Sequence, residues 1–475
     1  MTASRSALLD QHVTRRTVMI VVGAVVVWRM LMWFLVMRHV PLVGDEDYFV
    51  DRSRFIIRVL ERRTNGNELQ GIVNRAWWMP GPMILVTPIR WLTREIDMVR
   101  LWLGTVDLAL LLVAGWLAAR RFGAAIGLAF IAIVGIFPDA AAQSFAVWGE
   151  AIGSKLLVIM LLIVLGAVLD ENATFGHMAL AGLLLGIAVY FRPPLVLQLA
   201  AVAAMAMVAI HGRADRGRGT ASAAIVGAGV FIAMGLIVIA PWSVAASREN
   251  DALVLTTLSI DANAIHAFSN PSDLDAAAGG TGFRDIERYA QERQVSDDLG
   301  YADALRTIRR EQLDLVSFDD YWQRADREVE TFLDGSLTFL HQYRDLRADS
   351  GESTTAHTAL IVLHTVLWYV LILAVVWVML RPFPVHADAS SLFVSFLGRG
   401  SLALLAIQPF VSNAKFRHLG LAIPLMVLLV LVAAQLTARE PTDAPEMRRW
   451  SRVVIGVAQT LGVAGTVMMA VVYLN

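Results

Sequence analysis

Long runs of hydrophobic residues recur along the chain and are separated by polar segments of very different lengths. About eleven of these runs, at roughly 18 residues each, are long enough to cross the hydrocarbon layer of a bilayer as a helix. They lie near residues 17–39, 98–118, 122–138, 149–169, 177–192, 194–211, 221–241, 357–380, 391–411, 417–437 and 453–474. The pattern predicts an all-α polytopic membrane protein.

The polar segments predict the orientation of these helices. Short loops carry basic residues at Arg120-Arg121, at 211–218 and at Arg448-Arg449. Arg15 and Arg16 precede the first run, which we interpret as a retained anchor with a cytoplasmic N-terminus. Counted from there, the basic loops fall on the cytoplasmic side, in agreement with the positive-inside rule. The same count then places two long polar segments, about 40–97 and 242–356, outside the membrane.

Both outer segments contain short helical patterns. Trp77-Trp78 precedes a proline-punctuated apolar run, 83–92, that is too short to span and is typical of interfacial helices. Ser317 followed by Asp320 is typical of a helix start, and residues 321–333 continue with a helical pattern. We therefore expect interfacial helices in the first outer loop and a small, mostly helical outer domain in the second.

This pattern divides the chain into three parts. An N-terminal transmembrane module, 1–241, contains the outer loop at about 40–97. An outer domain follows at 242–356, and C-terminal transmembrane helices occupy 357–475.

Composition agrees with a membrane protein and excludes several other classes. The 475 residues are 57% hydrophobic and 17% charged, with a mean hydropathy of +0.59, so the lipid bilayer is the expected surrounding. The formal net charge of −1 argues against a nucleic-acid partner. No cysteine is present, which excludes disulfides, thiolate metal sites and cysteine nucleophiles.

Three consecutive carboxylates, Asp45, Glu46 and Asp47, followed by Tyr48, come shortly after the first hydrophobic run. The simpler explanation is a solvated loop that turns the chain away from lipid. The alternative is an acidic site at the membrane surface, where a carboxylate accepts a proton or holds a cation.

Other charged residues fall on the same predicted side of the membrane. They are Asp107, Asp139, Glu150, Lys155, Arg192, Lys415, Arg417 and His418. Asp107 is expected about 14 Å deep and could simply neutralise Lys155. Arg192 and Arg417 could instead reach lipid headgroups.

Carboxylates and cations on one surface suit an enzyme that handles a lipid phosphate. Arginine binds phosphate, and a nearby carboxylate can deprotonate a hydroxyl acceptor. The sequence lacks a glycine-rich phosphate loop, a His-Glu metal motif and a nucleophile elbow. An ATP-driven protein or a serine hydrolase is therefore disfavoured.

Several short motifs also occur in order along the chain. They are Gly44-Asp45-Glu46-Asp47-Tyr48, Met79-Pro80-Gly81-Pro82-Met83, Arg100-Leu101 with Ala118–Gly123, Trp148-Gly149-Glu150, Gly182–Pro193, Pro241-Trp242 with Leu258-Ser259 and Asn263, and Lys415-Phe416-Arg417-His418 with Pro424. In this order they resemble the GT-C superfamily of integral-membrane glycosyltransferases. That group includes protein O-mannosyltransferases (glycosyltransferase family 39-like) and lipid A aminoarabinose transferases. His418 stands where the family usually has tyrosine, and Gly81 between two prolines is unusual.

The resemblance implies transfer of a sugar, with inversion, from a polyprenyl-phosphate donor to a glycan, lipid or protein acceptor outside the plasma (inner) membrane. Asp45 is the matching position for the general base, with Glu46 or Asp47 orienting it, although Asp47 could take the proton itself. Phosphate contacts are then expected among Arg75, Arg100, Lys155, Arg192, Lys415 and Arg417. Further substrate-site candidates are Tyr48, Asp107, Asp139, Glu150 and His418.

Two other functions and one cofactor question stay open. A flippase or transporter of lipid-linked glycans would be expected to show internal repeats, which the sequence lacks. A polysaccharide ligase or polymerase would use a lipid-diphosphate donor. We expect no cofactor, although oxygen ligands in the acidic stretch could hold a divalent cation.

Overall fold

The structure is a computed structural model that describes residues 13–42, 44–64, 66–170, 174–212, 220–334, 339–349, 353–383, 385–411, 420–438 and 447–474. These residues form helices joined by loops. The helices are α2 (Arg15–Met32), η1 (Trp33–Met37), α3 (Asp45–Leu60), α4 (Glu68–Val73), η2 (Asn74–Ala76), α5 (Gly81–Leu92), α6 (Ile96–Phe122), α7 (Ala124–Ile136), α8 (Pro138–Gln143), α9 (Glu150–Leu169), α10 (Thr174–Phe191), η3 (Pro193–Val196), α11 (Leu197–Gly212), α12 (Thr220–Glu249), α13 (Ser259–Phe268), α14 (Pro271–Ala278), α15 (Phe283–Ser296), α16 (Tyr301–Asp314), α17 (Phe318–Leu333), α18 (Phe339–Asp349), α19 (Thr355–Leu380), α20 (Ala389–Leu392), η4 (Phe393–Leu397), α21 (Gly398–Leu405), η5 (Gln408–Phe410), α23 (Ile423–Ala438) and α24 (Arg449–Leu474).

The all-α polytopic membrane fold predicted from the hydrophobic runs is confirmed. Within the described ranges, seven helices are long and apolar enough to cross a membrane, and three shorter apolar helices, α7, α10 and α23, accompany them. The last predicted run lies within α24. The run near 391–411 differs from the prediction, because it is broken into α20, η4, α21 and η5.

Helix α9 is the centre of the bundle. Within it, 94% of the most apolar 18-residue window is buried inside the protein. It packs against α6, α10, α11 and α23. A helix that is apolar on every side belongs in such a position, because it has no face that prefers water. The first residue of α9, Glu150, is consequently held at one end of the bundle.

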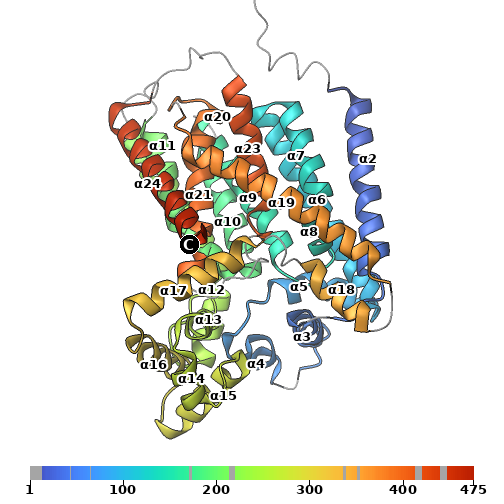
Figure 1. Ribbon diagram of the computed structural model, residues 1–475, viewed down its shortest axis with the longest axis vertical. Helices are drawn as coiled ribbons and strands as arrows, with labels where there is room; N and C mark the ends of the chain where they lie inside the picture. The colour runs from blue at the N-terminus through green and yellow to red at the C-terminus, as the bar shows by residue number, and fades with distance from the viewer. Residues whose placement is uncertain are drawn as a thin grey trace, which may run out of the picture.

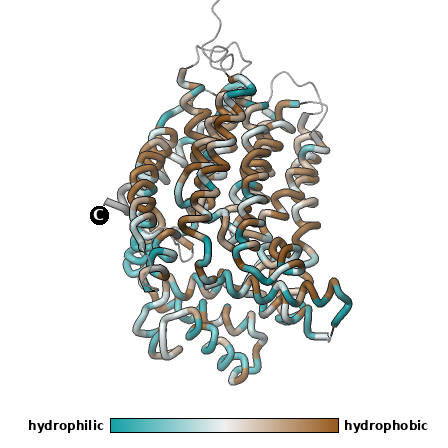
Figure 2. Tube along the Cα trace, turned by 90° about the vertical axis from the view of Figure 1, so that its right-hand side faces the viewer, coloured by the Kyte–Doolittle hydropathy of each residue, from teal (hydrophilic) through white to brown (hydrophobic). Residues whose placement is uncertain are grey.

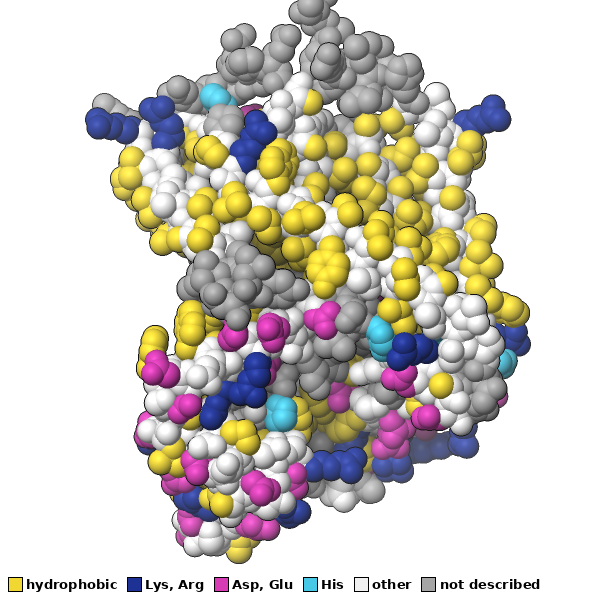
Figure 3. Space-filling model, in the orientation of Figure 1, with side chains coloured by type: hydrophobic (Ala, Val, Ile, Leu, Met, Phe, Trp, Pro, Cys, Tyr) yellow, Lys and Arg dark blue, Asp and Glu magenta, His cyan; other side chains and the backbone are white. Residues whose placement is uncertain are grey.

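Both long polar segments lie at the same end of the bundle. Figure 1 shows α3–α5 of the first segment and α13–α17 of the second below the ends of the long helices. The hydropathy colouring separates a hydrophobic bundle from a mostly hydrophilic end (Figure 2). In the space-filling view, hydrophobic side chains cover the bundle, acidic side chains gather over the polar end, and basic side chains lie at both ends (Figure 3).

Two helices can be compared with the pattern expected for the second polar segment. Helix α12 continues through Pro241 to Glu249, so it reaches beyond the predicted domain boundary at 241. The predicted start of α17 is confirmed, because the Ser317 side chain accepts a hydrogen bond from the Asp320 backbone N–H at 3.1 Å. Ala325, Val329 and Phe332 are the buried apolar side chains of this helix.

Asp107, inside the bundle, binds two cations. Its carboxylate lies 2.6 Å from Arg29 Nη1 of α2 and 2.8 Å from Lys155 Nζ of α9. All three side chains are almost completely buried. Charges in a membrane interior are costly unless paired, so this cluster connects α2, α6 and α9.

Candidate active site

A cavity of about 370 Å³ lies where the two polar segments meet the bundle. Six segments of the chain form most of its wall. They are the start of α3, the loop before α5, the start of α9 with the turn after α10, and helices α13 and α15. The lining residues are Asp45, Phe49, Trp77, Trp78, Met79, Trp148, Gly149, Glu150, Tyr190, Phe191, Arg192, Pro193, Pro194, Thr257, Ser259, Ile260, Asn263, Phe283, Arg284, Glu287 and Gln408. Most of the motifs noted in the sequence therefore contribute to one cavity.

Asp45 lines the cavity as the first residue of α3. Gly44 precedes it with φ 56°, a backbone conformation that residues with a Cβ adopt rarely. Carboxylates in the first turn of a helix are stabilised by its macrodipole, which favours acidic residues here. The side chain of Asp45 is partly exposed, so it is accessible from the cavity.

The neighbouring carboxylates of the acidic stretch lie in different environments. Glu46 is fully buried and accepts hydrogen bonds from Arg100 Nη2 at 3.2 Å and from the Val147 backbone N–H at 2.8 Å. Asp47 is exposed and does not line the cavity. Tyr48 also lies outside the lining, with its ring centroid 6.4 Å from that of Trp78.

Glu150 and Arg192 form an ion pair on the cavity wall. Arg192 Nη1 donates to Glu150 Oε1 at 2.8 Å, with Glu150 buried and Arg192 nearly so. The turn that carries Arg192 packs directly on two glycines. A Cβ on Gly149 would lie 2.0 Å from the Phe191 carbonyl oxygen, and one on Gly81 would lie 2.4 Å from that of Tyr190. The unusual Gly81 thus has a steric reason, since α5 could not approach α10 with a side chain there.

Arg284 and Glu287 of α15 are lining residues that the sequence analysis missed. Arg284 is exposed, and the structure gives its side chain no ion pair with any described residue. Glu287 Oε1 accepts from Arg75 Nη1 at 3.2 Å. No motif surrounds these residues in the sequence. The sequence indicated only that the second polar segment, about 242–356, lies on the same side of the membrane as the acidic stretch.

Aromatic and amide side chains complete the cavity. Trp77, Trp78 and Trp148 supply large apolar surfaces with a polar N–H edge. Asn263 lines it from α13, where its amide donates to the Ser259 carbonyl at 2.7 Å. Flat aromatic surfaces beside polar groups suit the faces and hydroxyls of a sugar ring or the start of an isoprenoid chain.

Several predicted site residues lie elsewhere. Asp107 and Lys155 pair with each other inside the bundle, as the simpler alternative expected. Arg100 is buried against Glu46, and Asp139 is buried and accepts from Gln143 at 2.7 Å. None of these four lines the cavity.

The remaining predicted cations divide into two groups. Arg75 lines a neighbouring cavity and reaches this one through its partner Glu287. Lys415, Arg417 and His418 lie outside the described residues.

The described residues contain no cluster of three or more histidine, aspartate or glutamate side chains that could hold a metal ion. Only Asp45 of the three consecutive carboxylates lines the cavity, because Glu46 is buried and Asp47 is exposed outside it. Metal independence stays a prediction.

Comparison with known proteins gives similarity to solved structures only. No family model and no curated protein matches the chain. An archaeal oligosaccharyltransferase, AglB from Archaeoglobus fulgidus in complex with an inhibitory peptide and a dolichol-phosphate, matches with a TM-score of 0.46 and 14% identity over 96% of this chain and 56% of that chain. A second structure of an oligosaccharyltransferase from the same organism, tethered to an acceptor peptide, matches with a TM-score of 0.49 and 12% identity over 96% and 55% of the two chains. The chain thus spans about half the length of the solved chains that it matches.

Proposed function

We propose that the protein is a membrane glycosyltransferase that moves a sugar from a polyprenyl-phosphate donor to a hydroxyl acceptor. The observation that carries the proposal is the cavity in which Asp45, the Glu150–Arg192 pair and Arg284 meet at the end of the bundle. It combines a carboxylate for proton transfer with cations for phosphate, beside a membrane-spanning bundle. The ordered motifs that resemble the GT-C superfamily support the same reaction.

Asp45 is the proposed general base. It lines the cavity, whereas Glu46 is committed to Arg100 and Asp47 faces outward. In the reaction, the acceptor oxygen bonds to the anomeric carbon of the donor sugar as its proton passes to Asp45. The bond from that carbon to the phosphate oxygen breaks, and polyprenyl phosphate leaves. A single displacement of this kind inverts the anomeric configuration.

Arg284 and Arg192 are the proposed phosphate contacts. Arginine presents several N–H donors in a plane, which matches the oxygens of a phosphate. Arg192 is paired with Glu150, so Arg284 is the lining cation that has no ion pair with a described residue and that is available to a phosphate. The tryptophans would pack on the sugar or on the first isoprene units.

The protein is a multi-pass membrane protein, and we place its cavity on the extracytoplasmic side of the plasma membrane. The basic short loops support this orientation through the positive-inside rule. A polyprenyl carrier suits such a location, because the lipid tail keeps the donor in the membrane while its sugar reaches the outer loops. The acceptor is a glycan, a lipid or a protein hydroxyl, and we predict that no metal is needed.

A donor assay tests the proposal directly. The purified protein in lipid nanodiscs would be given a labelled polyprenyl-monophosphate sugar or a polyprenyl-diphosphate oligosaccharide, each with a mixed pool of acceptors from the cell envelope. We expect transfer from the monophosphate donor, unchanged by a chelator. Transfer only from the diphosphate donor would instead support a ligase or polymerase. Movement of the intact lipid-linked glycan between leaflets, without transfer, would support a flippase.

A further inference from the structure

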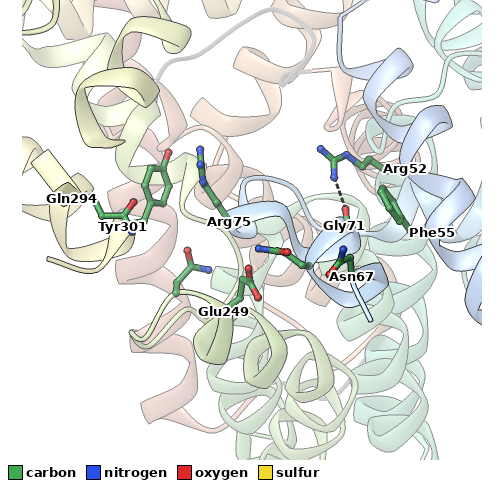
Figure 4. Close-up of a pocket in the computed structure, with 10 residues that line it drawn as sticks. Arg52, Phe55, Asn67, Gly71, Arg75, Glu249, Gln294 and Tyr301 are labelled. Atoms are coloured by element: carbon green, nitrogen blue, oxygen red, sulfur yellow. Dashed lines mark hydrogen bonds between the residues drawn. The ribbon is translucent and has the colours of Figure 1, made fainter. Parts of the chain in front are cut away.

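A second and larger cavity, of about 650 Å³, lies beside the proposed active site among the outer helices. Figure 4 shows its wall, which is formed by residues of α3, α4, η2, α12, α15 and α16. Its volume falls in the range typical of small-molecule sites. Neither the motifs nor the proposed reaction accounts for it.

Its charges are largely offset. Arg52 Nη1 donates to the Gly71 carbonyl at 2.9 Å, and its guanidinium lies 5.5 Å from the Phe55 ring centroid. Arg75 is paired with Glu287, and Glu249 contributes a carboxylate to the same wall. The two arginines and the two carboxylates, Glu249 and Glu287, cancel, so this wall offers a phosphate no net positive charge.

Amide side chains supply most of the remaining polar surface. Asn67, Gln70, Asn250 and Gln294 line the cavity. The amides of Gln70 and Gln294 make no side-chain hydrogen bond within the described parts of the chain. Each amide offers both a donor and an acceptor, which matches a hydroxyl group that also both donates and accepts.

Aromatic rings provide the apolar part of the wall. Phe55 lies at one side of the cavity, and Tyr301 lies at the other, beside Arg75 (Figure 4). Tyr301 is only 4% exposed, and its hydroxyl has no hydrogen-bond partner among the described residues. Burial, reinforced by the charge of Glu287, raises the pKa of Tyr301, so the hydroxyl stays protonated and can donate. A buried polar group without a partner suggests a site that a ligand or water completes.

We propose that this cavity binds a neutral saccharide. The amides of Gln70 and Gln294, the ring faces and a donor hydroxyl together recognise a hydroxyl-rich ring better than they would a lipid or a phosphate. The two cavities are adjacent, because Arg75 lines one and its partner Glu287 lines the other. This assignment rests on the proposed function: the bound saccharide is the glycan acceptor, and this site holds it next to the cavity that contains the base.

Saturation-transfer NMR on the full-length protein in nanodiscs would test this inference. The probes are maltotriose and an α-linked mannotriose, with inorganic phosphate as a competitor. We expect saturation transfer to at least one trisaccharide, and at least a fivefold weaker signal for the double variant Gln70→Ala/Gln294→Ala. Gln323→Ala, which removes an exposed amide of α17 outside both cavities, should leave the signal unchanged.

The two proposals fail in different ways. Three results would overturn the saccharide site. They are the absence of saturation transfer to both trisaccharides, an unchanged NMR signal in the double variant, and displacement of the trisaccharide by phosphate. The Asp45→Asn variant should keep the saccharide signal while losing transfer activity. Saccharide binding in a protein that turns over no polyprenyl-phosphate sugar would leave the site intact and contradict the proposed function instead.

Discussion

At the scale of single residues, the acidic stretch separates into three environments. One helical turn places Asp45 on the cavity, buries Glu46 against Arg100, and exposes Asp47 to solvent. The three side chains have similar chemistry, so the sequence identified the stretch and left the base open. Only the direction of each side chain from α3 distinguishes them, and that direction depends on how α3 packs against α5 and α6.

Arg284 gives a test at the residue scale. Arg284→Ala removes the lining cation that has no ion pair with a described residue. A charge-assisted hydrogen bond to phosphate contributes about 1.5–3 kcal/mol, so we expect the donor KM to rise on the order of 10- to 100-fold. Steady-state kinetics with the polyprenyl-monophosphate donor would measure it.

Arg310→Ala is the matched control, because this arginine is exposed on α16 and lines neither cavity. The control should keep the wild-type donor KM. A wild-type KM for Arg284→Ala as well would exclude this side chain from donor binding.

At the scale of elements, close contacts of the backbone build the wall of the active site. The C-terminal end of α10 packs on the start of α9 and on the start of α5, each time at a glycine. This contact brings Arg192 to Glu150. The sequence showed the glycines and the prolines of the turn, but it could not show that they meet, because many residues and at least two helices separate them.

Substitution of Gly149 tests this contact. Gly149→Ala would place a Cβ 2.0 Å from the Phe191 carbonyl oxygen, so the turn must move. Overpacking of this kind costs typically about 1–3 kcal/mol. We expect a lower thermal unfolding midpoint in detergent and weaker transfer activity.

Gly176→Ala provides the comparison, since a Cβ there meets nothing within 4 Å and alanine favours a helix. It should unfold at the wild-type temperature or slightly above. Equal stability of both variants would show that the turn adapts freely.

The buried charge cluster makes an asymmetric prediction. Asp107→Asn leaves Arg29 and Lys155 buried without their carboxylate, whereas Lys155→Met leaves the Arg29–Asp107 pair. Breaking a buried pair costs about 3–5 kcal/mol when a charge stays behind. We expect Asp107→Asn to lower the unfolding midpoint much more than Lys155→Met. The reverse order would mean that Asp107 is dispensable for the packing of these helices.

At the scale of the whole molecule, the hydrophobic pattern predicted the architecture well. Runs long enough to span a bilayer can satisfy their backbone only as helices, so length and hydropathy were sufficient. The pattern also separated the two long polar segments from the bundle, and both lie at one end of it. Arg284, Glu287 and the second cavity could not be predicted, since they depend on how α13–α16 dock on the first loop.

Orientation in the membrane is the next prediction. The chain has no cysteine, so single cysteines can be introduced without background. Gln323→Cys lies on the outer domain, and Arg120→Cys lies at the far end of α6. In intact cells, a membrane-impermeant maleimide should label Gln323→Cys. The same reagent should label Arg120→Cys only after the cells are permeabilised. The opposite pattern would place the cavity in the cytoplasm.

The most direct measurement of the central claim is the turnover of Asp45→Asn beside that of Asp47→Asn. Both substitutions keep side-chain volume and remove one carboxylate from the same helical turn. Loss of a general base lowers kcat about 10²- to 10⁴-fold, so we expect this loss for Asp45→Asn, with little change in donor binding. Asp47→Asn should retain most of the wild-type kcat, because Asp47 does not line the cavity. Full activity of Asp45→Asn, or a loss confined to Asp47→Asn, would contradict the assignment of the base.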